Sequence, residues 1–174
     1  MSEGIELIPQ MHGGGQEHRK RSGTENVPAI VGFAEALSLV QADRDAETKR
    51  LTPLRDRLTR GILEKIPDSR LNGPGIGKAN RLPNNVNISF RGLEGEAILL
   101  NLDMIGICAS AGSACTSGSI EPSHVIRALG LSEEWSHSAT RFTLGHGTTS
   151  QEIDFVLEKL PGIIKNLRET SPFV

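Results

Sequence analysis

Apolar residues in this 174-residue chain change several times between helical and strand-like spacing, and that order restricts the fold more than any other feature. They recur every three or four residues in the longer segments and at every second position in the shorter ones. The expected helices are residues 27–40, 51–66, 94–104, 122–129 and 149–167, and the expected strands are residues 86–90, 105–109 and 139–144. This order predicts a small α/β or α+β layer, a few-stranded sheet covered by helices on one side.

Proline and glycine set the expected boundaries. Pro53 should kink the second helix or mark a new start, with Thr52 as N-cap. Residues 4–10 alternate briefly and are expected to form an edge strand closed by Pro9. Residues 12–25 are polar and contain three successive glycines, which favours a linker or a loop at a site. A charge-rich face of the second helix is expected to be solvated surface: Arg50, Arg55, Asp56, Arg57 and Arg60.

The composition excludes several classes of function. Aromatic residues make up 3% of the chain, and the net charge is −2. Binding of single-stranded nucleic acid relies on stacking platforms and basic grooves, so no nucleic-acid partner is expected. The charge gives no attraction to anionic lipid, and no apolar run approaches the roughly 20 residues of a membrane helix. The N-terminus has no basic stretch followed by an apolar core, so we expect no secretory signal and a cytoplasmic protein.

Cys115 is the residue that points most clearly to chemistry. It lies within residues 109–119, a run of alanine, serine, glycine and threonine with no bulk to bury it. A cysteine kept for packing normally has apolar neighbours, whereas a thiol on a polar, flexible loop is accessible and able to move. The pattern favours a nucleophile or a sulfur carrier; the alternative is a loop that happens to carry a cysteine. Cys108 lies in an expected apolar strand beside Ile107 and Ala109, and its expected role is structural.

Cys115 would need a base or a positively charged partner, since the pKa of an unperturbed thiol is about 8.5. Spacing alone does not choose among the candidates. These are His124, His137, His146, Arg127 and Arg141.

Two further segments suggest anion binding. Arg141 opens an alternating Arg-Phe-Thr-Leu segment, where a guanidinium group would offer two parallel hydrogen bonds to a carboxylate; the alternative is an ordinary surface arginine. Residues 22–24, Ser-Gly-Thr, supply hydroxyls and backbone donors suited to a phosphate. No metal site is predicted, because His12 and His18, like the two cysteines, lack the close spacing of zinc ligands.

These residues belong to four motifs whose order resembles the C-terminal portion of cysteine desulfurases of the NifS/IscS type, in the class-V aminotransferase family. The resemblance runs along essentially the whole chain. The motifs are His-Gly-Gly-Gly-Gln-Glu (12–17) with Arg-Ser-Gly-Thr-Glu-Asn (21–26), Leu-Pro-Asn-Asn-Val-Asn-Ile-Ser-Phe (82–90) with Glu-Gly-Glu (94–96), Ser-Ala-Cys (113–115), and Arg-Phe-Thr-Leu-Gly (141–145).

The resemblance implies the small C-terminal domain of a fold-type-I pyridoxal-phosphate-dependent transferase that removes sulfur from L-cysteine and leaves L-alanine. By this resemblance Cys115 attacks the substrate sulfur and holds it as a persulfide, while Arg141 grips the substrate carboxylate. Thr24 would contact the cofactor phosphate, in this family from the neighbouring subunit of a homodimer. The implied partners are iron–sulfur scaffold proteins or other sulfur acceptors. No resident metal is implied, only a transient contact of an iron–sulfur centre with Cys115.

One part of the family pattern is missing from the sequence. The cofactor lysine lies in a Ser-x-His-Lys-type segment just before the region where this chain begins, and none of the chain's lysines has that context. A Schiff base needs an amine in the pocket, so the chain alone is expected to turn over no cysteine. The expected organisation is a segment at residues 1–25 leading from a large cofactor domain, followed by the small domain at residues 26–174. Loss of the large domain should expose apolar surface on helices that pack against it.

Two other functions remain open at this point. The chain could be a non-catalytic sulfur-relay or scaffold module that accepts a persulfide at Cys115 without making it. It could also belong to an enzyme of the same family with another substrate, such as selenocysteine.

Overall fold

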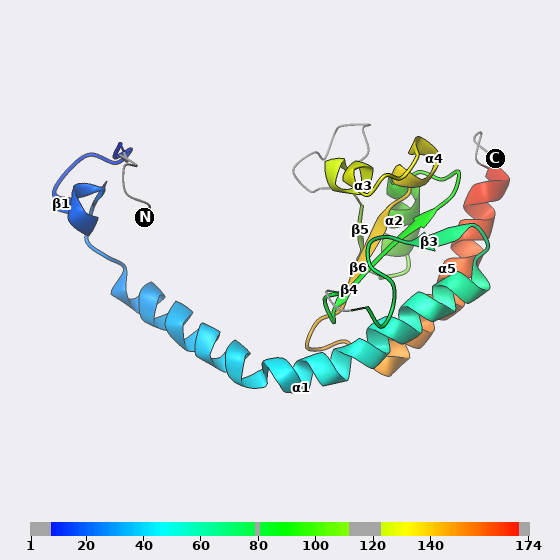
Figure 1. Cartoon of the computed structure of the whole chain (residues 1–174), viewed down its shortest axis with the longest axis horizontal. Helices are drawn as coiled ribbons and strands as arrows, with labels where there is room; N and C mark the ends of the chain where they lie inside the picture. Colours follow the sequence, from blue (N-terminus) through cyan, green and yellow to red (C-terminus); the bar gives the residue numbers. More distant parts are fainter. Residues whose placement is uncertain (1–7, 79–80, 112–122, 171–174) are drawn as a thin grey trace. The chain divides into compact units, whose positions relative to one another are not determined.

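The structure, a computed structural model, describes residues 8–78, 81–111 and 123–170, and the chain divides into two compact units, Met1–Arg44 and Asp45–Val174. In the first unit, strand β1 (Gly15–Gln16) pairs antiparallel with β2 (Arg21–Ser22) across the 3-10 turn η1 (Glu17–Arg19). The long helix α1 (Val27–Lys65) begins in this unit and ends in the second (Figure 1).

The second unit is built on an antiparallel sheet with the strand order β3-β4-β6-β5. Its central strands are β4 (Asn85–Phe90) and β6 (Thr140–Thr143). The edges are β3 (Ser69–Leu71) and the two-residue β5 (Ser110–Ala111). Strands β4 and β6 alternate between buried and partly exposed residues at their paired positions, so one face of the sheet is apolar and the other polar.

Helices cover the apolar face. They are the C-terminal part of α1, α2 (Gly95–Asp103) and α5 (Ser150–Thr170) (Figure 1). Two short helices, α3 (His124–Ala128) and α4 (Glu133–Ser136), lie between β5 and β6 in the sequence. The fully buried residues of the core come from β4, α1, α2 and α5: Val86, Ile88, Phe90, Leu58, Ile62, Ile98, Leu102, Leu160 and Ile164. The predicted fold class is confirmed, as are the central strands and the helices α2, α3 and α5.

Helices α1 and α5 pack closely because position 61 carries no side chain. A Cβ atom at Gly61 would lie 2.6 Å from Leu157 Cδ2. The ammonium group of Lys65 donates a hydrogen bond to the backbone oxygen of Leu157 (3.2 Å) one turn further along α1. The two helices therefore run side by side over the C-terminal part of α1 (Figure 1).

Three expectations about secondary structure are wrong. The new start expected at Pro53, with Thr52 as N-cap, is wrong: helix α1 continues through Pro53, because Leu51 and Leu58 are buried on either side of it and packing outweighs the lost hydrogen bond. Residues 105–109 form no strand: Gly106 has a φ of +78° and closes a turn after α2, so the strand starts only at Ser110. Residues 8–10 of the expected edge strand are not in a strand, and the rest of it lies outside the described residues.

The charged face expected on α1 is also partly wrong, because Arg55 is only 5% exposed. Its Nε and Nη2 donate to Asp56 Oδ1 at 2.8 and 2.6 Å. Its Nη1 donates to the backbone oxygen of Leu82 (2.9 Å), so this guanidinium ties α1 to the segment before β4. Of the same face, Arg57 and Arg60 are exposed as expected.

We expect Arg55→Ala to lower the free energy of unfolding by about 2–3 kcal/mol, because it leaves the Leu82 carbonyl and the Asp56 carboxylate without their donor. The matched control is Arg57→Ala, which removes an exposed pair with Asp154 and should cost less than about 1 kcal/mol. Urea unfolding of both variants measures the difference. Equal losses would show that burial of Arg55 contributes nothing.

Among the described residues, no helix is both long and apolar enough to cross a membrane.

Candidate functional site

Arg141 lies on the polar face of the sheet, at the second position of β6. Its neighbours in the strand, Thr140 and Phe142, are buried, whereas Arg141 is half-exposed. Its register partners are Asn87 of β4 on one side and Ser110 of β5 on the other. Within the described part of the chain, no hydrogen bond or ion pair engages its side chain. The guanidinium group is thus positioned by the sheet and available to a ligand.

Cys115 lies outside the described residues, but the strand that precedes it is described. Strand β5 ends at Ala111, four residues before Cys115. Because Ser110 pairs with Arg141 and Ala111 with Thr140, the last described residues before Cys115 lie beside the strand of Arg141. Arg141 and the strand that ends four residues before Cys115 are therefore neighbours in the sheet, although Cys115 and Arg141 are 26 positions apart in the sequence.

Thr24 belongs to the first compact unit and Arg141 to the second. Thr24 is exposed and lies between β2 and the start of α1. Two residues later, Asn26 Oδ1 accepts a hydrogen bond from the backbone N–H of Ala29 (3.1 Å), which makes Asn26 the N-cap of α1.

The expectation that Cys108 is buried in a strand is wrong. Its side chain is exposed and lies in the coil between the turn at Gly106 and β5. It lines a cavity of about 310 Å³. The walls of the cavity are mainly apolar and come from β6 and α5, with Phe142, Leu144, Ile153, Phe155 and Val156 among them. Apolar neighbours in the sequence did not bury this thiol, because the chain there follows the surface.

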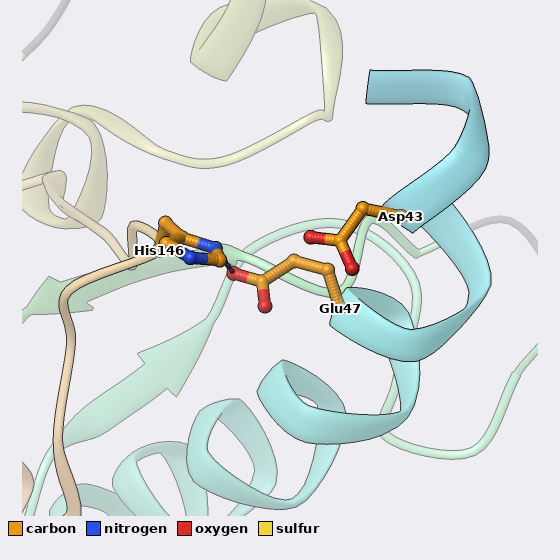
Figure 2. Close-up of side chains that lie close together, drawn as sticks. All are labelled: Asp43, Glu47 and His146. Carbon is orange, nitrogen blue, oxygen red and sulfur yellow. Dashed lines mark ion pairs between the residues drawn. The ribbon is translucent and has the colours of Figure 1, made fainter. Parts of the chain in front are cut away.

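Two of the five candidate partners for Cys115 already face a carboxylate. His137 Nδ1 lies 3.9 Å from Glu94 Oε2. His146 Nδ1 lies 3.5 Å from Glu47 Oε1, as Figure 2 shows. His124 is exposed at the start of α3. Which group activates Cys115 stays a prediction.

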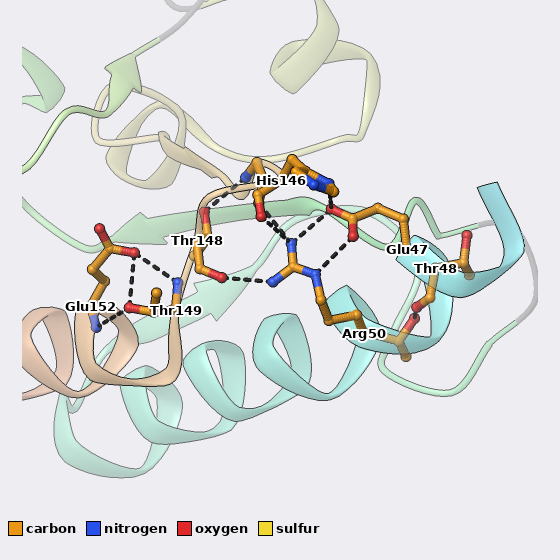
Figure 3. Close-up of polar contacts among 9 residues, drawn as sticks. Glu47, Thr48, Arg50, His146, Thr148, Thr149 and Glu152 are labelled. Atoms are coloured by element: carbon orange, nitrogen blue, oxygen red, sulfur yellow. Dashed lines mark hydrogen bonds and ion pairs between the residues drawn. The ribbon is translucent and has the colours of Figure 1, made fainter. Parts of the chain in front are cut away.

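Arg50 organises the loop that follows β6, a role that the sequence did not reveal (Figure 3). Its Nη1 donates to the backbone oxygen of Thr148 (2.7 Å), and its Nη2 to those of Gly145 (3.0 Å) and His146 (2.9 Å). Both oxygens of Glu47 in turn accept hydrogen bonds from Arg50 at 2.7 Å. These bonds from Arg50 lower the pKa of the Glu47 carboxyl. Arg50 thereby fixes the loop at the C-terminal end of the strand that carries Arg141.

A second polar group lies on the same sheet face as Arg141. The Asn72 side chain is 5% exposed, and its Nδ2 donates to Asn87 Oδ1 (2.7 Å) and to Ser89 Oγ (2.8 Å). The backbone N–H of Asn72 donates to the backbone oxygen of Asn87 (2.9 Å). The amide of Asn87 is therefore held in one orientation beside Arg141.

None of the described residues supplies the enclosed amine that a pyridoxal phosphate site needs. The six lysines of the chain are all described, and every one of them is exposed. A Schiff-base lysine needs an amine enclosed in a pocket, where its pKa falls and water is excluded. Arg141 is suited to a substrate carboxylate and Thr24 to a phosphate, but no described lysine is placed to join the cofactor.

Comparison with known proteins relates the chain to one family. Residues 3–156 match the model of the family described as aminotransferase class-V. A cysteine desulfurase IscS of Clostridium botulinum is 49% identical over 172 residues, and a cysteine desulfurase of Trichormus azollae is 51% identical over 170 residues. The matches cover 99% and 98% of this chain but only 43% and 42% of the relatives, so the chain spans less than half of their length.

Solved structures give the same relation. A NifS-like protein superposes with a TM-score of 0.77 at 30% identity, over 95% of this chain and 41% of that one. A NifS-like protein from Rickettsia africae superposes with a TM-score of 0.75 at 31% identity, over 92% of this chain and 41% of that one. Because the family model covers most of the sequence, the chain belongs to the aminotransferase class-V family.

Proposed function

We propose that this chain is the part of a cysteine desulfurase that binds the substrate carboxylate and receives the sulfur. Enzymes of this family depend on pyridoxal phosphate. The observation that carries the proposal is the pairing of β5 with β6. It places the last described residues before Cys115 beside Arg141, whose guanidinium has no partner among the described residues. One side chain would hold the amino acid while the other reacts with its sulfur.

The reaction balances without an external oxidant or reductant. L-Cysteine and the Cys115 thiol give L-alanine and a Cys115 persulfide. The carbon–sulfur bond of the substrate breaks, a sulfur–sulfur bond forms at Cys115, and the substrate carbon gains a proton in place of sulfur. Arg141 contributes by holding the carboxylate in a two-pronged, charge-assisted contact that fixes the position of the amino acid.

Other parts of the proposal follow from the family alone. They are the segment at residues 1–25 leading from a cofactor domain, the small domain at residues 26–174, and contact of Thr24 with the cofactor phosphate across a homodimer. A scaffold or acceptor protein that takes the sulfur, and a cytoplasmic location, belong to the same proposal.

The test is formation of L-alanine from L-cysteine by the longer protein that contains this chain, with pyridoxal phosphate added. We expect L-alanine and persulfide sulfur in equal amounts, and none from L-serine, which carries oxygen in place of sulfur. The 174-residue chain alone should form none. A longer protein that accepts sulfur from a persulfide donor but makes no L-alanine would contradict the proposal and favour a sulfur-relay module. A strong preference for selenocysteine would instead change the substrate.

A further inference from the structure

We propose that Asn87 is a second donor to the carboxylate that Arg141 binds, and that Asn72 positions it for this role. The inference rests on the proposed function, since the carboxylate is that of the amino-acid substrate. It concerns the polar face of the sheet, at the central strands β4 and β6, and involves described residues of the second unit only.

The first step of the argument is register. Asn87 and Arg141 are direct partners on neighbouring antiparallel strands, so their side chains leave the same face of the sheet. Paired Cβ atoms in such a ladder lie about 4.5–5.5 Å apart. A carboxylate bound by the guanidinium of Arg141 is therefore within reach of the amide of Asn87.

The second step is the orientation of the Asn87 amide. Its Oδ1 accepts the hydrogen bond from Asn72 Nδ2 (2.7 Å). Asn72 follows strand β3, on the side of β4 opposite β6 in the sheet order. Because the carbonyl of Asn87 is directed toward Asn72, its NH₂ group is the end of the amide left for a ligand, and an amide NH₂ only donates.

The third step is availability. Asn87 is half-exposed, and its Nδ2 donates no hydrogen bond to any described residue. The same holds for the guanidinium of Arg141. The Asn87 amide and the Arg141 guanidinium, neither engaged by another described residue, thus lie side by side on neighbouring strands. The other cross-strand partner of Arg141 is Ser110, so no acidic side chain is paired with either donor in the described sheet. Such a pair favours an anion with two oxygens.

Asn72 shows that this orientation is built into the fold. Its side chain is buried, and its Oδ1 has no hydrogen-bond partner among the residues that the structure describes. An unsatisfied buried carbonyl lowers the stability of the fold. The NH₂ group of the same amide donates to both Asn87 and Ser89. The loss of stability is consistent with a residue kept to hold Asn87 in place.

The experiment compares three variants of the longer protein in the conversion of L-cysteine to L-alanine. Asn87→Ala should raise the KM for L-cysteine about tenfold with little change in kcat, as expected for loss of one hydrogen bond to a charged group. Asn87→Asp keeps the oxygen that accepts from Asn72 but places a negative charge beside the carboxylate, so it should raise KM further while the melting temperature stays the same. The matched control is Asn85→Ala, two residues earlier on the same strand and face, opposite Thr143, and it should leave KM unchanged.

An unchanged KM in Asn87→Ala, or equal changes in the Asn85 and Asn87 variants, would overturn the inference. A KM of Asn87→Asp equal to that of the unmodified protein would also overturn it, because Asn87 would then have a structural role only. Binding of L-alanine to the same variants, followed by ligand-observed NMR, separates this inference from the proposed function. If the unmodified protein makes no L-alanine from L-cysteine but loses L-alanine binding on Asn87→Ala, the proposed reaction fails and the carboxylate site stands.

Discussion

Cys115→Ser in the longer protein is expected to abolish transfer of sulfur from L-cysteine to an acceptor thiol. A serine hydroxyl at this position cannot take up sulfur as a persulfide, and it remains protonated at neutral pH, whereas a thiol is partly ionised. L-Cysteine should still bind to the variant, because Arg141 and Asn87 on the sheet are unchanged. We therefore expect loss of turnover with substrate affinity retained.

The measurement is persulfide labelling of the protein after incubation with L-cysteine, alongside the rate of L-alanine formation. The matched control is Cys108→Ser, since Cys108 is exposed and lies only seven positions earlier in the sequence. It should keep both the persulfide signal and the rate. A persulfide retained in Cys115→Ser, or lost only in Cys108→Ser, would move the nucleophile to the other cysteine.

Phe90→Ala is expected to lower the free energy of unfolding by about 3–5 kcal/mol. Phe90 ends β4 and is fully buried in the core. Its removal leaves a cavity in the layer of side chains between the sheet and the helices, and the surrounding chain is fixed by the hydrogen bond from the Phe90 backbone N–H to Ser138 Oγ (2.8 Å). Since small domains have only about 5–15 kcal/mol of stability, the loss should be a large share of the total.

Urea unfolding followed by circular dichroism measures this change. The control is Phe155→Ala on α5, where the ring is 40% exposed and lies 5.7 Å from the ammonium group of Lys159. It should cost less than about half as much, because much of its surface is already in water. Similar losses in the two variants would place the folding core elsewhere.

The sequence predicted correctly those helices and strands that bury one face in the core and expose the other along their whole length. Apolar residues are buried at alternate positions of β4, and α5 buries Ile153, Leu157, Leu160 and Ile164 on one side, so their periodicity is visible without a structure. The failures occurred where tertiary contacts override local preference. Pro53 lies within a helix held by packing, and Arg55 is buried because its partners, Asp56 and Leu82, satisfy it.

The candidate site was predicted only in part, for a related reason. Arg141 was predicted because it opens an alternating segment, and Cys115 because the small residues around it have no bulk to bury it. Asn72 and Asn87 are 15 positions apart and meet only through the register of the sheet. Arg50 contacts a loop 95–98 positions away. No local pattern in the sequence signals such pairs, because their residues are common in loops and on surfaces.

The two halves of helix α1 have different environments. Residues 27–44 are all exposed and include large apolar side chains such as Phe33, Leu39 and Val40, whereas Leu51, Leu58 and Ile62 are packed. Most of the stability of a helix in a protein comes from tertiary packing, and the exposed residues 27–44 have little of it. The backbone amide hydrogens of the first half should therefore exchange rapidly with deuterium in the isolated chain, while those of the second half remain protected. The packed second half of α1 would then stay folded against the sheet while residues 27–44 open and close.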